Sequence, residues 1–130
     1  MQKQQTSETT KILIAEDQDD LREMIAHTLR LSGYEVVSAE NGERAVQLAT
    51  KTNPDLIILD YELPRLNGRQ VCKRLKALET FTNTPIVIIS SYGNPRYMEA
   101  SLEAGAEEFI RKPFELDHLI QRVDTLLAAD

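Results

Sequence analysis

A chain of 130 residues is long enough for one compact domain with a single core, and too short for a catalytic domain joined to an output domain. With 42% hydrophobic and 28% charged residues, its composition argues against a disordered or fibrous protein. The 15 basic and 21 acidic residues leave a formal net charge of −6, which argues against a surface that neutralises nucleic-acid phosphates.

Two further classes of protein are disfavoured by simple counts. No apolar run approaches the roughly 18 residues of a membrane span and no signal-peptide pattern opens the chain, so we expect a cytoplasmic protein. The single cysteine, Cys72, cannot form an internal disulfide, and two histidines cannot build a Cys/His metal cage. Any bound metal must therefore be held by oxygen ligands.

Hydrophobic periodicity predicts the architecture. The polar residues 1–10 predict a flexible N-terminal tail, and residues 11–130 predict one domain. The expected strands cover 12–15, 35–39, 56–59, 86–89 and 108–111, and the expected helices cover 19–32, 42–52, 68–79, 96–104 and 115–128. Strict alternation of strands and helices predicts a doubly wound α/β fold with a parallel sheet.

Polar side chains follow four of the predicted strands, where ligands bind in doubly wound sheets. These acid, hydroxyl and amine groups belong to Glu16 and Asp17, Asp60 and Glu62, Ser90 and Ser91, and Lys112. Crowded carboxylates repel one another unless a cation lies among them, and ligation by oxygen alone suits Mg²⁺. The acids Glu16, Asp17 and Asp60 therefore predict a magnesium site at the carboxyl edge of the sheet.

In their order and spacing, these motifs resemble those of response-regulator receiver domains, in particular the chemotaxis regulators, over residues 11–128. The resemblance rests on the pair Glu16-Asp17, the segment LDYELPRLNG at 59–68, Ser90, the pair Gly105-Ala106 ahead of Phe109, and the run Lys112-Pro113-Phe114. It implies a flavodoxin-like sheet of five parallel strands in the order 2-1-3-4-5. It also implies a cis peptide bond before Pro113.

The resemblance implies a signalling switch driven by phosphorylation. Asp60 is then the nucleophile that accepts a phosphoryl group from a phosphohistidine on a sensor kinase or phosphotransfer protein. Mg²⁺, held by Glu16, Asp17, Asp60 and the backbone carbonyl of Glu62, is expected to neutralise charge on the phosphoryl oxygens. We expect no other enzymatic activity beyond this transfer and slow autodephosphorylation.

The resemblance also assigns residues that sense the phosphoryl group. Lys112 pairs with one phosphoryl oxygen, Ser90 donates a hydrogen bond to another, and Phe109 rotates inward as the loop after the fourth strand shifts. The fourth helix, fifth strand and fifth helix then bind or release a protein partner. We expect a stand-alone regulator, monomeric or dimerising on phosphorylation, with no direct contact to nucleic acid and no membrane insertion.

Three residues depart from the common family pattern or tune it. Glu16 stands where Asp is commoner, and its extra methylene can weaken the magnesium contact or redirect it, for example through water. Glu62 and Tyr92 occupy positions that influence the lifetime of the phosphoryl group in this family. The sequence leaves the direction of both effects open.

Two alternative functions fit part of the pattern. A haloacid dehalogenase-type phosphatase also uses an Asp nucleophile with Mg²⁺, and Asp17-Gln18-Asp19 resembles its first motif, but this reading leaves Asp60 unexplained. Asp19 and Asp20 are more simply the acidic first turn of a helix. A pseudo-receiver that binds partners without phosphorylation is weakened because acceptor, acid pair, hydroxyl and lysine are all present. A flavin site lacks its phosphate-binding loop.

Overall fold

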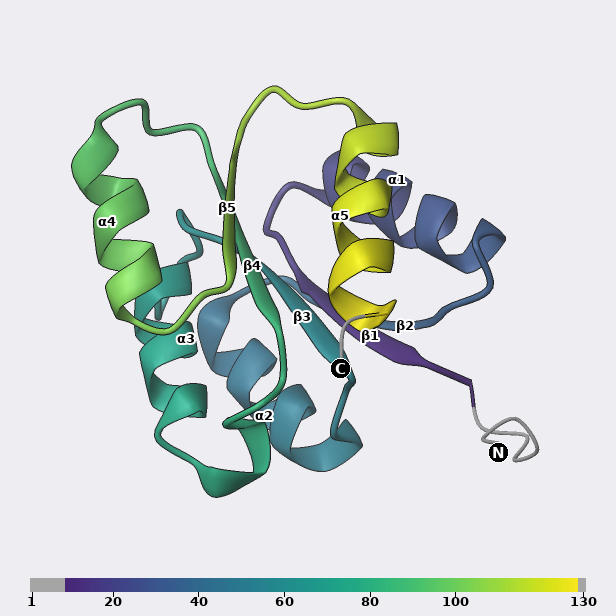
Figure 1. The fold of residues 1–130 in the computed structure, drawn as a ribbon, viewed down its shortest axis with the longest axis horizontal. Helices are drawn as coiled ribbons and strands as arrows, with labels where there is room; N and C mark the ends of the chain where they lie inside the picture. The colour runs from purple at the N-terminus through teal and green to yellow at the C-terminus, as the bar shows by residue number, and fades with distance from the viewer. Residues whose placement is uncertain (1–8, 129–130) are drawn as a thin grey trace.

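A computed structural model describes residues 9–128 as helices packed on both faces of a parallel sheet (Figure 1). The strands are β1 (Lys11–Ala15), β2 (Glu35–Ala39), β3 (Leu56–Asp60), β4 (Ile86–Ser90) and β5 (Glu108–Arg111). The helices are α1 (Asp19–Leu31), α2 (Gly42–Thr52), α3 (Gly68–Lys76), α4 (Pro95–Glu103) and α5 (Leu116–Ala128). The strand order β2-β1-β3-β4-β5, with every pairing parallel, confirms the predicted flavodoxin-like fold.

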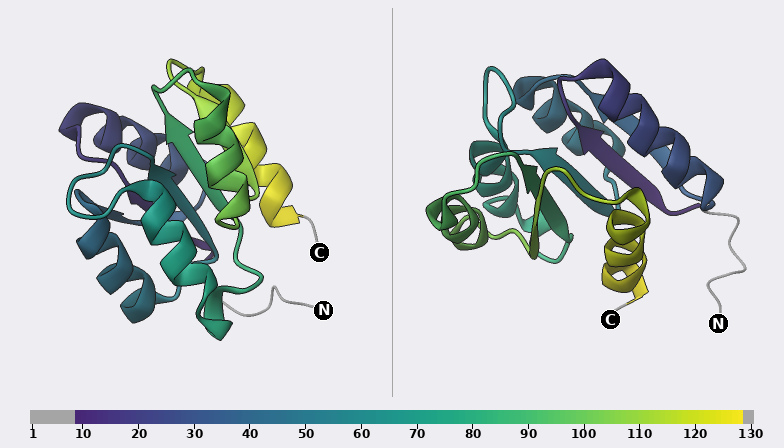
Figure 2. Two further views of the ribbon diagram at one scale, coloured as in Figure 1. Left: turned by 90° about the vertical axis from the view of Figure 1, so that its left-hand side faces the viewer. Right: turned by 90° about the horizontal axis from the view of Figure 1, so that it is seen from above.

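Alternate residues of each strand face opposite helical layers, because successive side chains of a strand point to opposite faces. On one face, Ile12 and Ile14 of β1 belong to a buried cluster with residues of α1 and α5. On the other face, Leu13 and Ala15 belong to a cluster with residues of α2 and α3. Figures 1 and 2 show these two helical layers on either side of the sheet. Coverage of both faces explains why the central strands are apolar along their length.

The described boundaries lie within one residue of those predicted, except at the end of α3. This helix ends at Lys76 instead of 79, because Leu78 has extended backbone angles and a 3₁₀ turn, η2 (Glu79–Phe81), follows it. The Lys76 Nζ donates to the carbonyl oxygen of Thr84 at 2.6 Å, which ties the end of α3 to the segment that follows this turn. Helical periodicity alone could not reveal this tertiary contact.

The beginning of α3 is fixed against the end of β3. Asn67 and Gln70 form a capping box, in which each side chain accepts a hydrogen bond from the backbone N–H of the other residue, at 2.8 and 2.9 Å. Gly68 allows a close approach, since a Cβ there would lie 2.5 Å from the carbonyl oxygen of Asp60. The loop after β3 therefore folds back tightly beneath Asp60.

The chain before β1 is only partly described. Residues 1–8 of the predicted tail lie outside the described residues. Thr10 is paired, since its carbonyl oxygen accepts a hydrogen bond from the Glu35 N–H at 2.9 Å. Between residues 9 and 128, no helix combines the length and the apolar character that crossing a bilayer requires.

Candidate functional site

Three buried polar side chains lie where β1, β3 and β4 end, at one edge of the sheet. Asp60 and Ser90 are the last residues of β3 and β4, and they are 1% and 0% exposed. Glu16 directly follows β1, is 0% exposed, and its N–H donates to the Ala39 carbonyl oxygen at 3.0 Å. One acid after β1, one acid at the end of β3 and one hydroxyl at the end of β4 therefore lie at the same edge of the sheet.

Glu16, Asp17 and Asp60 form an acidic cluster, in which one carboxylate oxygen of each residue lies within 4.8 Å of the others. Asp17 is exposed, whereas the other two are buried. Glu16 Oε2 accepts the Gln18 N–H at 3.0 Å, but buried Glu16 Oε1 has no hydrogen-bond donor among the described residues. A buried acceptor without a donor, set among like charges, fits a cation, and an all-oxygen set of this size suits Mg²⁺.

Lys112 supplies the nearest positive charge to the acidic cluster. Its Nζ donates to Asp60 Oδ2 at 2.8 Å and lies 3.3 Å from Glu16 Oε1, a charge contact without hydrogen-bond geometry. The Lys112 N–H donates to the Ser90 carbonyl oxygen at 2.8 Å, which anchors the residue beside β4. The peptide bond before Pro113 is cis, as the resemblance implied. One ammonium group therefore faces two buried carboxylates.

The pKa shifts of Asp60 and Lys112 reflect both their burial and the groups that contact them. Burial raises the pKa of Asp60, and the Glu16 carboxyl raises it further. The hydrogen bonds that Asp60 accepts from Lys112 and from the Glu62 N–H, which lies 2.9 Å from Oδ1, act to lower it but do not outweigh the rise. Burial acts to lower the pKa of Lys112, but the hydrogen bond and charge of Asp60, together with Glu16, outweigh it and the pKa is raised. Lys112 therefore stays protonated, while the ionised form of Asp60 is disfavoured.

A second group of side chains near Asp60, the hydroxyl cluster, consists of one carboxylate and two serines: Glu62, Ser90 and Ser91. The Ser90 hydroxyl donates to Glu62 Oε2. The N–H and hydroxyl of Ser91 donate to Glu62 Oε1 at 3.2 and 3.1 Å. The sequence indicates Ser90 as a site residue but does not reveal its pairing with the Glu62 side chain. The spacing of Glu62, two residues after Asp60, was the only sequence signal that placed it near the site.

Three tyrosines from separate segments pack beside the hydroxyl cluster. The ring of Tyr61, next to Asp60, lies 5.2 Å from that of Tyr97 on α4 and 5.9 Å from that of Tyr92. The Tyr92 and Tyr97 ring centroids are 4.5 Å apart. Phe109 on β5 is half-buried and packs, like Tyr97, against the core cluster of α2 and α3. Aromatic contacts therefore connect the loop after β4 with α4.

A shallow hollow of about 420 Å³ opens beside Lys112, between α1 and the loop that leads into α5. Its lining is mostly apolar and comprises Leu21, Met24, Ser91, Lys112, Pro113, Phe114 and Leu116. The surface beside Lys112 on this side is therefore mostly apolar.

Comparison with known proteins agrees with the geometry of this site. A family model described as the response regulator receiver domain matches residues 12–124. Over 116 residues, 89% of this chain and 51% of the relative, the chain is 38% identical to the phosphate regulon transcriptional regulatory protein PhoB of Pseudomonas aeruginosa. The chain thus spans about half the length of the curated relatives it matches.

Solved structures show the same fold at similar coverage. The chemotaxis response regulator CheY4 of Vibrio cholerae is 28% identical with a TM-score of 0.86, over 92% of this chain and 99% of that one. The signal receiver domain of a signal transduction histidine kinase from Syntrophus aciditrophicus is 35% identical with a TM-score of 0.85, over 92% and 90%. This chain therefore belongs to the receiver-domain family of two-component response regulators.

Proposed function

We propose that Asp60 accepts a phosphoryl group from a phosphohistidine of a sensor kinase or phosphotransfer protein, and that the domain then changes its binding to another protein. The observation that carries this proposal is the Lys112–Asp60 pair at 2.8 Å beside the Glu16 oxygen that has no hydrogen-bond donor among the described residues. This arrangement offers a nucleophile, a cation for the phosphoryl group and carboxylates for a metal ion. The family supports phosphorylation-dependent signalling in general.

In the proposed transfer, a carboxylate oxygen of Asp60 attacks phosphorus while the P–N bond to the histidine breaks. The imidazole nitrogen keeps the electron pair of that bond, and the ring leaves neutral when its other nitrogen carries a proton. The Glu62 N–H holds Asp60 Oδ1 at 2.9 Å and Lys112 holds Oδ2, so the carboxylate is oriented before the donor arrives. Lys112 is then placed to pair with a phosphoryl oxygen.

Glu16, Asp17, Asp60 and the backbone carbonyl of Glu62 are the groups that would hold Mg²⁺. When bound, Mg²⁺ neutralises charge on the transferring phosphoryl oxygens. Glu16 is longer than the aspartate that is commoner at this position, but its buried carboxylate lies among the same oxygens as Asp17 and Asp60. The extra methylene therefore leaves the carboxylate within the cluster.

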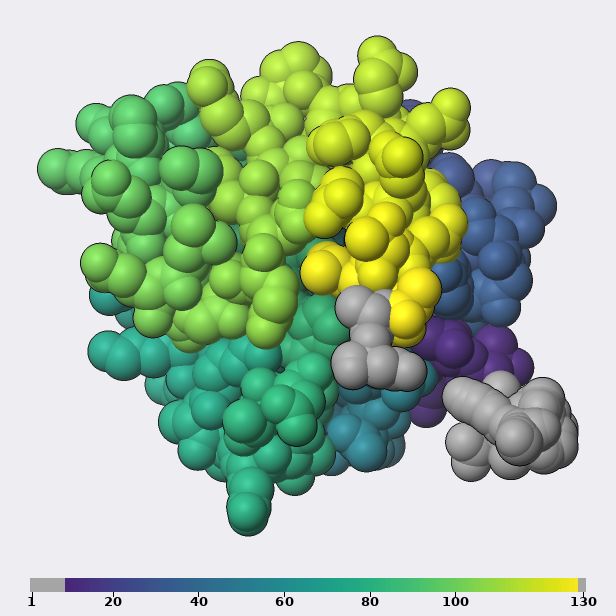
Figure 3. All heavy atoms as spheres, viewed as in Figure 1, coloured from purple at the N-terminus to yellow at the C-terminus, as the bar shows by residue number. Residues whose placement is uncertain are grey.

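The readout follows from the new charge on Asp60. A phosphoryl group adds close to −2 of charge and three acceptor oxygens. Ser90 would turn its hydroxyl toward that group, the loop after β4 would follow, and half-buried Phe109 would move inward. The surface that changes is the one on which α4, β5 and α5 lie side by side in Figure 3. Its partner is another protein, or a second copy of the domain, and autodephosphorylation resets the state.

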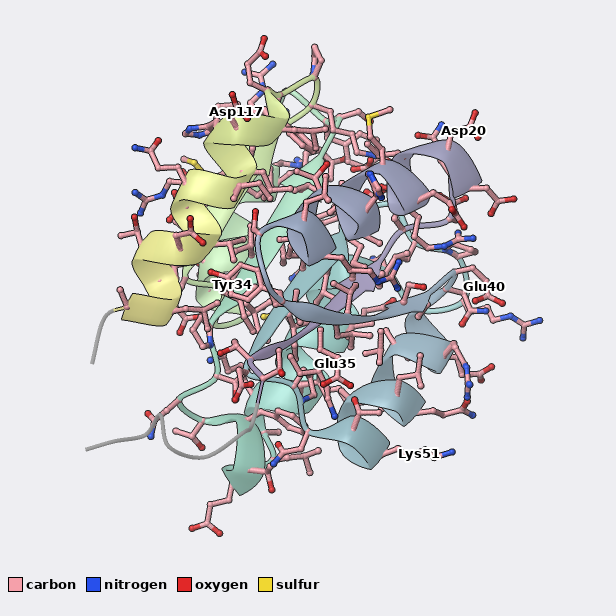
Figure 4. All side chains as sticks on the ribbon, turned by 90° about the vertical axis from the view of Figure 1, so that its right-hand side faces the viewer. Asp20, Tyr34, Glu35, Glu40, Lys51 and Asp117 are labelled. Carbon is pink, nitrogen blue, oxygen red and sulfur yellow. The ribbon has the colours of Figure 1, made fainter. Side chains whose placement is uncertain are left out.

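Intact-mass measurement after incubation with Mg²⁺ and acetyl phosphate tests the acceptor. The wild type should gain the mass of one phosphoryl group, and Asp60→Asn should gain none. Asp20→Asn is the matched control, because Asp20 is exposed on the first turn of α1, as Figure 4 shows, and should be labelled like the wild type.

The two alternative functions predict different results in this experiment. A phosphatase that uses the acids after β1 requires turnover of phosphate esters to persist in Asp60→Asn. A pseudo-receiver requires the wild type to stay unlabelled while a competent response regulator is labelled alongside. Either result would overturn the proposed function.

A further inference from the structure

The Glu62 carboxylate is bonded to the same hydroxyl that the proposed switch requires. We propose that Glu62 is an internal competitor of the phosphoryl group, which holds Ser90 and Ser91 in the unphosphorylated domain and must be displaced for the switch to occur. This inference rests on the proposed function and assigns a role to the side chain of Glu62. It also gives that role a direction, since Glu62 then favours the unphosphorylated state.

The competition follows from the number of protons on the Ser90 hydroxyl. A hydroxyl group has one proton to donate, and Ser90 gives it to Glu62 Oε2. An Oγ lone pair accepts the Tyr92 N–H at 3.0 Å. Ser90 can therefore donate to Glu62 or to a phosphoryl oxygen on Asp60, but not to both at once.

The Glu62 carboxylate presents the loop with the kind of acceptor that a phosphoryl group presents. Both are anions with several oxygens, and Glu62 uses its two oxygens to accept three donors from Ser90 and Ser91. Ser90 is fully buried and Glu62 half-buried, so water competes weakly for the bond between them. Two anions would not share these donors, and a phosphoryl group therefore has to drive Glu62 away.

Release of Glu62 would reach α4 through Tyr92. The Tyr92 N–H is bonded to Ser90 Oγ, and the Tyr92 ring lies 4.5 Å from that of Tyr97 in the first turn of α4. A change in the Ser90 hydroxyl therefore changes a hydrogen bond of the residue that packs on α4. This path connects the competitor with the face that the proposed function assigns to the partner.

The test measures the affinity of the domain for beryllium fluoride in the presence of Mg²⁺, with beryllium fluoride as the probe that stands in for a phosphoryl group. Glu62→Asp keeps the charge but shortens the side chain by one methylene, so it should lose contact with the two serines and bind the probe about tenfold more tightly. If Glu62 acted only by charge repulsion of the probe and did not compete for Ser90, this variant would not bind the probe more tightly than the wild type. Glu43→Asp, an exposed acid on α2, is the matched control and should bind like the wild type.

Two further variants test the competition, and the first does so without changing any charge. Ser91→Ala removes one donor to Glu62 without changing any charge, and should tighten binding of the probe by about threefold. Glu62→Gln keeps the length of the side chain but loses its charge, and should also bind more tightly than the wild type. Equal affinity of the wild type, Glu62→Asp and Ser91→Ala would overturn the proposal.

Exchange of the Ser91 amide hydrogen gives a readout that needs no phosphoryl group. This N–H donates to Glu62 Oε1, so it should exchange faster in Glu62→Asp than in the wild type. If the wild type is labelled by acetyl phosphate but neither affinity nor exchange differs in Glu62→Asp, the competitor is disproved and the proposed function stands. If the wild type takes neither label nor probe, both proposals fall.

Discussion

The acidic cluster, which includes Asp60, and the hydroxyl cluster differ in how many of their buried oxygens accept a hydrogen bond. In the acidic cluster, the two buried carboxylates share one ammonium group, and a buried oxygen of Glu16 lacks a hydrogen-bond donor among residues 9–128. In the hydroxyl cluster, both oxygens of Glu62 are paired. Glu16 Oε1 can therefore contact a cation without losing a hydrogen bond, whereas the hydroxyl cluster can respond only by exchanging one acceptor for another.

The largest expected effect comes from removing the only ammonium group that contacts the acidic cluster within the described residues. Lys112→Met should lower the free energy of unfolding by about 3 kcal/mol in the absence of Mg²⁺, because it leaves Glu16 and Asp60 buried without a positive partner. Addition of Mg²⁺ should recover part of this loss. Urea titration measures both quantities.

Lys51→Met is the control for this experiment. Lys51 is exposed on the last turn of α2, as Figure 4 shows, and its replacement should change the unfolding free energy by less than about 0.5 kcal/mol. Equal losses in the two variants would mean that Lys112 does not balance the buried acids.

The next effect in size is stabilisation by Mg²⁺. At a concentration ten times its dissociation constant, a ligand of the folded state adds about 1.4 kcal/mol to the free energy of unfolding, so the melting temperature should rise. This gain should shrink in Asp17→Asn and Asp60→Asn and persist in Asp20→Asn, which scanning calorimetry can measure. An unchanged gain in both of the first two variants would count against the acidic cluster as the metal site.

A smaller and opposite effect is expected for Asp60→Asn without metal. Because the folded state raises the pKa of Asp60, it disfavours the ionised carboxylate that is present at neutral pH. The uncharged isostere should therefore be more stable than the wild type, by about 1 kcal/mol, as is common for residues kept for function at a cost in stability. A less stable Asp60→Asn variant would show that the Lys112 pair outweighs the repulsion.

The smallest effect concerns the hydrogen bond between Tyr34 and Asp124, which belong to neither cluster. Tyr34, labelled in Figure 4, donates a hydrogen bond to Asp124 on α5, and burial together with Asp124 raises the pKa of Tyr34 to about 12. Between its ordinary pKa of about 10 and this value, the unfolded chain loses the tyrosine proton while the folded chain keeps it, so stability falls as pH rises.

Tyr34→Phe should reduce this decline and cost at most about 0.5 kcal/mol at neutral pH, since the bond is at the surface. Denaturation at pH values from 9 to about 12 would show the difference in slope. Parallel curves for the two proteins would remove Tyr34 as the cause of the decline. The result would also show whether an ordinary carboxylate pair behaves differently from the two clusters.

The fold and the meeting of the acids were predictable because both depend on strand positions. Buried apolar runs marked the central strands, and Glu16 and Asp60 come directly after such runs or end them. The carboxyl ends of parallel strands meet at one edge of the sheet, and the strand order that the resemblance implies makes β1 and β3 neighbours, so these acids were expected to lie together. Lys112 was placed near them by the same rule, as the residue after β5.

The hydroxyl cluster was not predictable, because it depends on side-chain conformations and loop paths. Glu62 is in a loop, and its side chain is oriented toward Ser90. The contacts among Tyr61, Tyr92 and Tyr97 likewise join three separate segments. Neither arrangement leaves a periodic signal or a fixed spacing in the sequence.

The most direct test of Asp60 as the phosphoryl acceptor is to locate the phosphoryl group within the chain. The protein is exposed to Mg²⁺ and acetyl phosphate, the acyl phosphate is reduced with borohydride, and peptide mass spectrometry identifies the modified residue. The proposed function predicts modification of Asp60 alone, and none when Mg²⁺ is withheld. Modification of another residue, or none while a competent response regulator is modified alongside, would contradict it.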